Sequence, residues 1–165
     1  MNEPKYIIIH HTATLRDKTT FEAVKNYHIS KGWGDIGYHY FITADGTTHD
    51  GRKEITVGAH CVASDMNYRS IGICLTGNFE KEKPTEEQLE SLLSLVTILK
   101  NKYNIPKDNV VGHGSVMGAK TLCPGKNLID WFVTYLETDE DSVKHEKIGS
   151  IKTLICQALS ILNTI

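Results

Sequence analysis

The stretch KYIIIHHTAT, residues 5–14, is the part of the chain around which we expect the fold to form. Its apolar run, Tyr6 to Ile9, is too short for a helix and rich in β-branched side chains, which predicts a buried central strand. Successive strand side chains point to opposite faces, so His10 and His11 should diverge, one toward the core and one into an opening at the strand's end. Neutral imidazole is a common metal ligand, but two polar residues that only end a strand would look the same.

The length and composition of the chain are typical of a globular protein with one domain. The chain has 165 residues, of which 40% are apolar and 23% charged. A net charge of -2 offers no basic surface, so we expect no nucleic-acid partner. No apolar run approaches the length of a membrane span, and the start, MNEPKYIIIHH, is not typical of a secretory signal. We therefore expect no membrane partner and a chain made in the cytoplasm.

Hydrophobic spacing predicts strands and helices along the rest of the chain. A first helix should begin at Thr19 or Thr20 and end near Lys31, and a stronger one should follow a capping box of Thr85 and Gln88. Four further strands are expected at 38–43, 47–50, 70–76 and 110–111, and a helix near 128–136. This order predicts a central mixed β-sheet flanked by helices, in the α/β or α+β class.

The composition changes after residue 136. Residues 137–147, ETDEDSVKHEK, are charged and lack apolar periodicity, which predicts a linker. Residues 148–165 then carry an apolar stripe at helical spacing. This amphipathic helix would either pack back on the main domain, residues 1–136, or stay exposed and mediate a homodimer or a contact with a cell-wall or membrane partner.

Three positions at or beyond strand ends carry candidate metal ligands: His10 or His11, His113, and Cys123. A catalytic zinc ion takes imidazole and thiolate, keeps three protein ligands and leaves one position for water. Each residue alone also fits a structural role, and spacing does not establish that the three converge. The four cysteines, at 61, 74, 123 and 156, are widely spaced, which favours a single ligand over a disulfide framework.

Five stretches follow one another as in a known family: IIIHHTAT, WGDIGYHYFITADGTTHDGR, VGAHCVASDMNYRSIGICLTGNF, VVGHG and TLCPGKNLID. Together they resemble the type 2 N-acetylmuramoyl-L-alanine amidases, which include phage T7 lysozyme-like amidases and peptidoglycan recognition proteins. The resemblance covers residues 5–136. It implies one Zn²⁺ in an open groove and hydrolysis of the amide between N-acetylmuramic acid and L-alanine, with peptidoglycan or a muropeptide as substrate. Such an enzyme would lyse the wall as an endolysin or recycle wall fragments in the cytoplasm.

The resemblance also implies roles for particular residues. His10, His113 and Cys123 match the three zinc ligands, and Tyr38 matches the tyrosine beside the zinc-bound water. Family members that have lost this cysteine look like binding proteins that do not cut. The alternative function is therefore a non-catalytic peptidoglycan-binding module, and the presence of Cys123 and Tyr38 favours the enzyme.

Further residues match the family's loops. Thr121, or Lys120 next to it, corresponds to the residue that assists the leaving amine. His60 and Asn67 lie in the loop that lines the family's substrate groove, where they are expected to contact the sugar or the stem peptide.

The chain departs from the family pattern at two motifs. The second histidine stands in GHGS, with Gly114 and Ser115 where the family often has Arg and Asp. Cys74 stands where some relatives carry a glutamate that serves as general base. The base is therefore either assisted by Tyr38 or comes from elsewhere.

Overall fold

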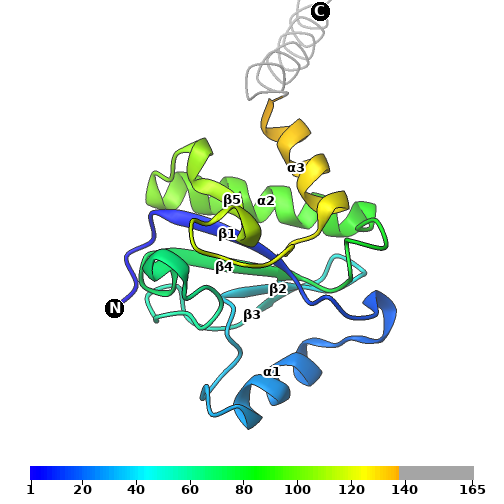
Figure 1. Ribbon diagram of the computed structural model, residues 1–165, viewed down its shortest axis with the longest axis horizontal. Coiled ribbons are helices and arrows are strands. Elements are labelled where there is room, and N and C mark those ends of the chain that lie inside the picture. The colour runs from blue at the N-terminus through cyan, green and yellow to red at the C-terminus, as the bar shows by residue number, and fades with distance from the viewer. Residues whose placement is uncertain (138–165) are drawn as a thin grey trace, which may run out of the picture. The chain divides into compact units, whose positions relative to one another are not determined.

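The computed structural model describes residues 1–137, of which Met1–Asp130 form one compact unit around a five-stranded sheet (Figure 1). The strands stand in the order β3-β2-β4-β1-β5, so β1 and β4 are central. Their bounds are β1 Tyr6–His11, β2 Tyr40–Ile42, β3 Thr48–Asp50, β4 Ser70–Leu75 and β5 Val110–Gly112. The predicted buried first strand is confirmed, since Ile7, Ile8 and Ile9 are at most 1% exposed.

Strand pairing is mixed, as predicted. β1 runs parallel to both β4 and β5, β2 runs parallel to β4, and β3 is antiparallel to β2. In this register His10 pairs with Cys74, and Ile9 pairs with Gly112. Parallel strands end at the same edge of a sheet. The residues that follow β1 and β5 are therefore brought together although they lie about a hundred positions apart.

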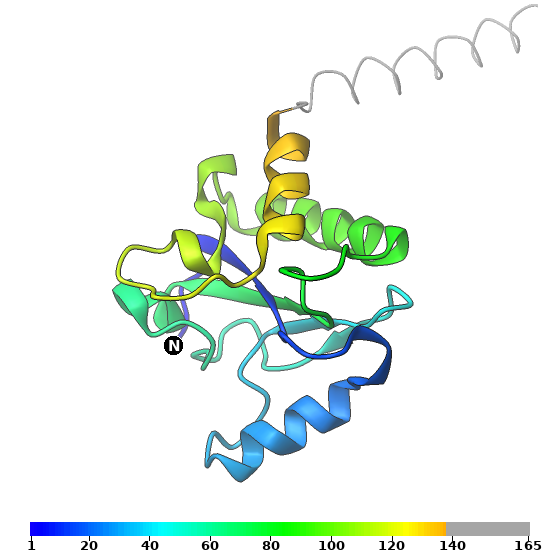
Figure 2. The ribbon, with the colours of Figure 1, turned by 45° about the vertical axis from the view of Figure 1, so that its right-hand side comes forward.

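Helices lie on both sides of the sheet (Figure 2). Helix α1, Phe21–Ser30, contributes Phe21 and Val24 to a cluster with the buried Phe41 and Cys74. Helix α2, Glu86–Tyr103, contacts β2 and buries Leu92, Val96 and Leu99 along one side. Helix α3, Lys126–Glu137, begins directly after the CPG motif. All three helices were expected from the spacing of their apolar residues.

The two predicted helix starts are confirmed by their caps. The Thr20 hydroxyl accepts a hydrogen bond from the backbone N–H of Ala23. Thr85 and Gln88 form a full capping box, in which each side chain accepts from the other's backbone N–H. Gln88 is fully buried, and its amide also donates to the Thr76 carbonyl at 2.9 Å. The start of α2 is thereby tied to the end of β4.

A second group of polar contacts joins β2 to the C-terminal end of α2. The Glu54 carboxylate accepts hydrogen bonds from the hydroxyls of Tyr40 and Tyr103, and it pairs with Lys102 at 2.8 Å. These four side chains line part of a cavity of about 570 Å³ that includes none of the three candidate metal ligands. Because the polar groups of the four already satisfy one another, we assign them a structural role.

Some predicted elements differ from those observed or lie outside the described residues. The segment predicted as a loop before β4 contains 3-10 turns over Ala63–Tyr68, in which Ser64 and Asp65 have left-handed backbone angles. Short turns of this kind carry no hydrophobic period, so sequence spacing does not reveal them. The predicted helix over 148–165 and all of the linker except Glu137 lie outside the described residues, and their roles stay predictions. Within residues 1–137, no helix is long and apolar enough to cross a bilayer.

We expect Gln88→Leu to lower the free energy of unfolding by about 1–3 kcal/mol, because it leaves the buried carbonyl of Thr76 and the partly buried N–H of Thr85 without their partner. Chemical denaturation measures the loss. The matched control is Glu90→Leu at an exposed position of the same helix, which should change stability by less than about 0.5 kcal/mol. Equal losses in the two variants would contradict the assigned role of Gln88.

Candidate metal centre

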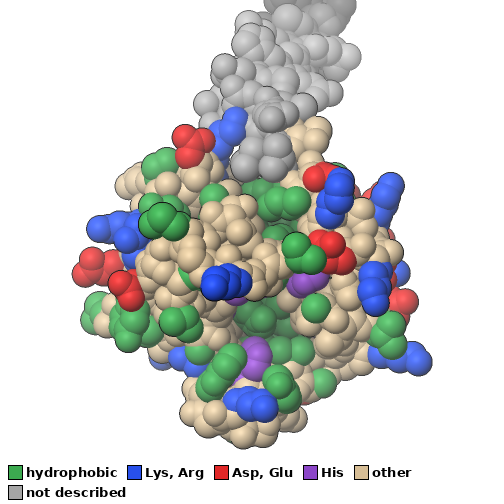
Figure 3. Space-filling view, viewed as in Figure 1, with side chains coloured by type: hydrophobic (Ala, Val, Ile, Leu, Met, Phe, Trp, Pro, Cys, Tyr) green, Lys and Arg blue, Asp and Glu red, His purple; other side chains and the backbone are tan. Residues whose placement is uncertain are grey.

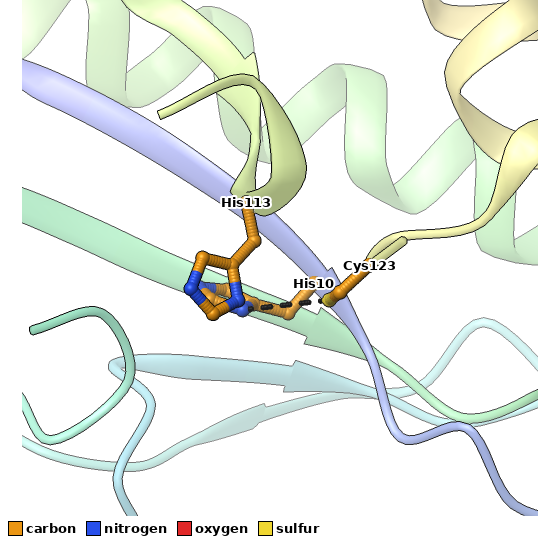
Figure 4. Close-up of side chains that lie close together, drawn as sticks. All are labelled: His10, His113 and Cys123. Atoms are coloured by element: carbon orange, nitrogen blue, oxygen red, sulfur yellow. Dashed lines mark hydrogen bonds between the residues drawn. The ribbon is translucent and has the colours of Figure 1, made fainter. Parts of the chain in front are cut away.

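Three side chains predicted as ligands meet at the carboxyl edge of the sheet (Figure 4). The ligand atoms of His10, His113 and Cys123 all lie within 4.8 Å of one another. His10 Nδ1 is 3.7 Å from the Cys123 sulfur, and the two imidazole rings are 4.6 Å apart between centroids. Tetrahedral zinc with bonds of 2.0–2.3 Å needs ligand atoms about 3.5 Å apart. The three side chains therefore fit one shared ion with small rotations.

Separate parts of the fold place each candidate ligand. His10 is near the end of β1 and His113 follows β5, so strand pairing brings both to one edge. Cys123 comes from the loop before α3, and hydrogen bonds hold both its backbone N–H and its backbone carbonyl. The Cys123 N–H donates to the Thr121 hydroxyl at 3.1 Å, and its carbonyl accepts from the N–H of Gly114 at 2.6 Å. The backbone N–H of His11 also donates to the Cys123 sulfur at 3.4 Å.

Burial sets the protonation states of these candidate ligands. It lowers the pKa of His10 well below 6.5, with neighbouring His60 and His113 acting in the same direction, and it lowers the pKa of His113 as well. Both imidazoles are therefore neutral at pH 7, as a metal ligand must be. Burial raises the pKa of the Cys123 thiol to about 12 in the metal-free protein. Metal binding must therefore release the thiol proton.

Tyr38 and Cys74 lie beside this cluster. The Tyr38 ring is 5.2 Å from the His10 ring between centroids. Burial, and then the nearby thiols of Cys74 and Cys123, raise the pKa of Tyr38 well above 10, so its hydroxyl keeps its proton and can donate. Cys74 is fully buried on β4, and burial raises the pKa of its thiol well above 9. A neutral thiol is no general base at pH 7, which leaves that role to another group.

The remaining predicted residues occupy different surroundings. Lys120 and Thr121 are exposed, and the Thr121 hydroxyl contacts the Cys123 backbone. His60 places Nδ1 3.0 Å from Nε2 of His10, and Asn67 accepts hydrogen bonds from the backbone N–H groups of His60 and Cys61 through its side-chain oxygen. The proton-transfer roles of Lys120 and Thr121 and the substrate contacts of His60 and Asn67 stay predictions.

His11 and His39 make hydrogen bonds that support the fold. His11 points to the opposite side of β1 from His10, where its Nδ1 accepts from the backbone N–H of Phe79 at 3.1 Å. His39 is buried, and its Nδ1 accepts from the Gly72 N–H at 3.0 Å.

Sequence reasoning missed two residues that support the segment leading to Tyr38. The Arg52 guanidinium donates to the carbonyls of Trp33, Ile36 and Val57 at 2.7–2.8 Å. His28 of α1 accepts from the N–H of Gly37 at 2.9 Å through Nδ1. The one signal for His28 in the sequence is a histidine at helical spacing among the apolar residues of α1.

The surface over this region is hollowed (Figure 3), and histidine side chains are visible in it among hydrophobic ones. The family model described as N-acetylmuramoyl-L-alanine amidase matches residues 1–126. The chain belongs to this family. The fold, a mixed five-stranded sheet with helices on both sides, is the one expected from the resemblance, and solved structures of family members share it.

Curated relatives include phage enzymes and animal proteins. The endolysin of Enterobacteria phage T3 is 34% identical, over 76% of this chain and 83% of the relative. Peptidoglycan-recognition protein SC2 of Drosophila melanogaster is 33% identical, over 77% of this chain and 71% of the relative.

Among solved structures, an endolysin N-acetylmuramoyl-L-alanine amidase from Clostridium intestinale has a TM-score of 0.73 and 37% identity, covering 82% of this chain and 85% of its own. A peptidoglycan recognition protein-LE in complex with tracheal cytotoxin has a TM-score of 0.69 and 32% identity, covering 81% of each chain. Both similarities extend over most of the family region.

We expect Gly114→Ala to weaken binding of Zn²⁺, used as the probe ion, by about tenfold or more. A methyl group at this position would lie 2.6 Å from the Thr121 carbonyl oxygen and 3.1 Å from that of Cys123, so the loop carrying the thiolate must shift. Competition with a chelating dye measures the affinity. Ser115→Ala, at the exposed neighbouring position, is the control and should bind as the wild type does. Unchanged affinity in Gly114→Ala would show that the loop tolerates the methyl group.

A second prediction concerns pH and His28. Burial, and then the Arg52 charge, lower the pKa of His28 below 6.5 in the folded protein. Its contribution to stability is therefore full above pH 6.5 and is lost as pH falls through the folded pKa, because the unfolded state binds the extra proton. His11 and His39 share this direction. The His28→Asn variant keeps a hydrogen-bond acceptor for the Gly37 N–H, but the asparagine side chain does not titrate. The variant should therefore take up about one proton fewer than the wild type when it unfolds in acid. Denaturation midpoints of the metal-free protein between pH 5 and 8 measure the difference, and parallel pH profiles would contradict it.

Proposed function

We propose that this protein is a zinc-dependent amidase that hydrolyses the amide between N-acetylmuramic acid and L-alanine in peptidoglycan or muropeptides. The observation that carries the proposal is the cluster of two imidazoles and one thiol at the sheet edge, in a chain of the amidase family. The activity would serve wall lysis, as the names of the endolysin relatives suggest, or the recycling of wall fragments.

The donor set favours zinc over other common ions. Thiolate with imidazole is a typical zinc set, whereas Mg²⁺ and Ca²⁺ prefer oxygen ligands. In residues 1–137 the cluster comprises three ligands, the number found in catalytic rather than structural zinc sites. When bound, zinc would lower the pKa of a water molecule to about 7 and polarise the substrate carbonyl.

The chain's own residues would then act on the substrate. The Tyr38 hydroxyl, which keeps its proton at pH 7 and belongs to a ring beside His10, would donate a hydrogen bond to the carbonyl oxygen as that oxygen gains charge. A proton must also reach the leaving amine of L-alanine. We assign its delivery to Lys120 or Thr121, which are exposed on the loop that leads to Cys123.

Exposed apolar residues near the candidate site residues in the sequence support a sugar–peptide substrate. Exposed apolar side chains stand close in sequence to site residues: Val62 after His60, Leu122 before Cys123 and Trp33 before Tyr38. Such side chains supply contact area for sugar rings and peptide stems. The similar recognition protein-LE binds tracheal cytotoxin, a monomeric diaminopimelic acid-type peptidoglycan. A muropeptide is therefore the ligand class that we assign to this chain.

We expect Cys123→Ala to reduce the release of free L-alanine N-termini from purified peptidoglycan by more than about a hundredfold, since metal stabilisation of the reaction is worth several kcal/mol. A chelator should do the same to the wild type, and added Zn²⁺ should restore it. Cys61→Ala removes a buried thiol outside the cluster and should keep the wild-type rate. Peptidoglycan binding without release of amino groups by the wild type would show a binding module instead. Chelator-sensitive cleavage by Cys123→Ala at the wild-type rate would remove the thiolate from the ligand set.

A further inference from the structure

His60 makes a direct contact with one of the proposed ligands. The two nitrogens of the His10 ring face different partners: Nδ1 is 3.7 Å from the Cys123 sulfur, and Nε2 is 3.0 Å from Nδ1 of His60. The rings of His10 and His60 meet edge to face, with centroids 5.0 Å apart. His60 therefore lies behind the ligand, on the side away from Cys123.

The protein is shaped to hold the His60 ring in this place. A side chain at Gly72, in the middle of the buried strand β4, would come within 2.6 Å of the ring, and one at Gly58 would come within 2.5 Å. Both glycines leave space that the imidazole fills, and for Gly72 this is a usual reason for a glycine inside a strand. The Asn67 side chain fixes the backbone that carries the ring, accepting from the N–H groups of His60 and Cys61 at 2.8 and 2.9 Å.

The contact has only one proton arrangement compatible with a metal ligand at Nδ1 of His10. That nitrogen must offer its lone pair, so the His10 proton must be on Nε2. Nε2–H then donates to Nδ1 of His60, which must accept, and the His60 proton is left on its own Nε2. This last atom is buried and has no hydrogen-bond partner within the part of the chain that the structure describes.

We propose that His60 is a positioning residue for the metal centre, which accepts a hydrogen bond from Nε2–H of His10 and so holds Nδ1 of His10 as the ligand atom. The inference rests on the proposed metal centre. It gives His60 a role distinct from the substrate contact expected from its loop. Its two nitrogens face His10 and the backbone at Gly58, not Cys123, so His60 acts through His10 and is not a fourth ligand.

Two substitutions separate this role from simple packing. His60→Leu fills a similar volume without an acceptor, and we expect it to weaken Zn²⁺ binding by about 10- to 100-fold in dye competition. His60→Asn keeps an oxygen where Nδ1 stood and should stay within about threefold of wild type. Thermal melts of the metal-free variants report any general loss of packing. Wild-type affinity in His60→Leu, or equal loss in both variants, would overturn the proposal.

A measurement on the wild-type protein tests the proposed proton positions on His10 and His60 and does not depend on whether the variants fold. Nitrogen-15 histidine NMR of the Zn²⁺-loaded chain should show both His10 and His60 as neutral rings protonated at Nε2. A His60 proton on Nδ1, or a bare Nε2 on His10, would overturn the proposal while leaving the metal centre intact. Absence of any Zn²⁺ binding by the wild type would instead overturn the metal centre on which the proposal depends.

Discussion

Parallel pairing of β1 with its two neighbours is the constraint on which the rest of the structure depends. It places the carboxyl ends of β1, β4 and β5 at one edge, so residues distant in sequence become neighbours there. His10 and His113 arrive through this pairing alone, because each stands at or just beyond the end of its strand. Only Cys123 needs a loop. The hydrogen bond from Gly114 joins that loop to the segment after β5, and the one to Thr121 lies within the loop.

Because side chains alternate along β1, two adjacent histidines face opposite sides and have different roles. His10 faces the cluster, while His11 faces the other side and accepts from the Phe79 backbone. His11 still contributes to the cluster, since its backbone N–H donates to the Cys123 sulfur. A hydrogen bond to sulfur favours the thiolate over the thiol, so it opposes the effect of burial on the pKa of Cys123. One dipeptide thus supplies one candidate ligand and supports another.

The elements of the fold and the three clustered residues were predictable because each depends on local patterns or recurring motifs. The apolar run before His10, the capping box at Thr85 and the motifs around His113 and Cys123 are all visible in the sequence. The contact of His60 with His10 was not, since it depends on the packing of a loop against a strand fifty positions away in the chain. The one local signal for this contact was Gly72, a residue without a side chain at a position of a buried strand where a side chain is expected.

The surroundings of the cluster also bear on which group manages protons in the proposed reaction. Cys74 and Tyr38 are next to His10, and burial raises the pKa of both, so at pH 7 both hold their protons. Neutral donors around a carbonyl stabilise negative charge on its oxygen, but they do not remove a proton from water. In the proposed reaction these buried donors would stabilise charge, while the proton for the leaving amine would come from Lys120 or Thr121 on the exposed loop.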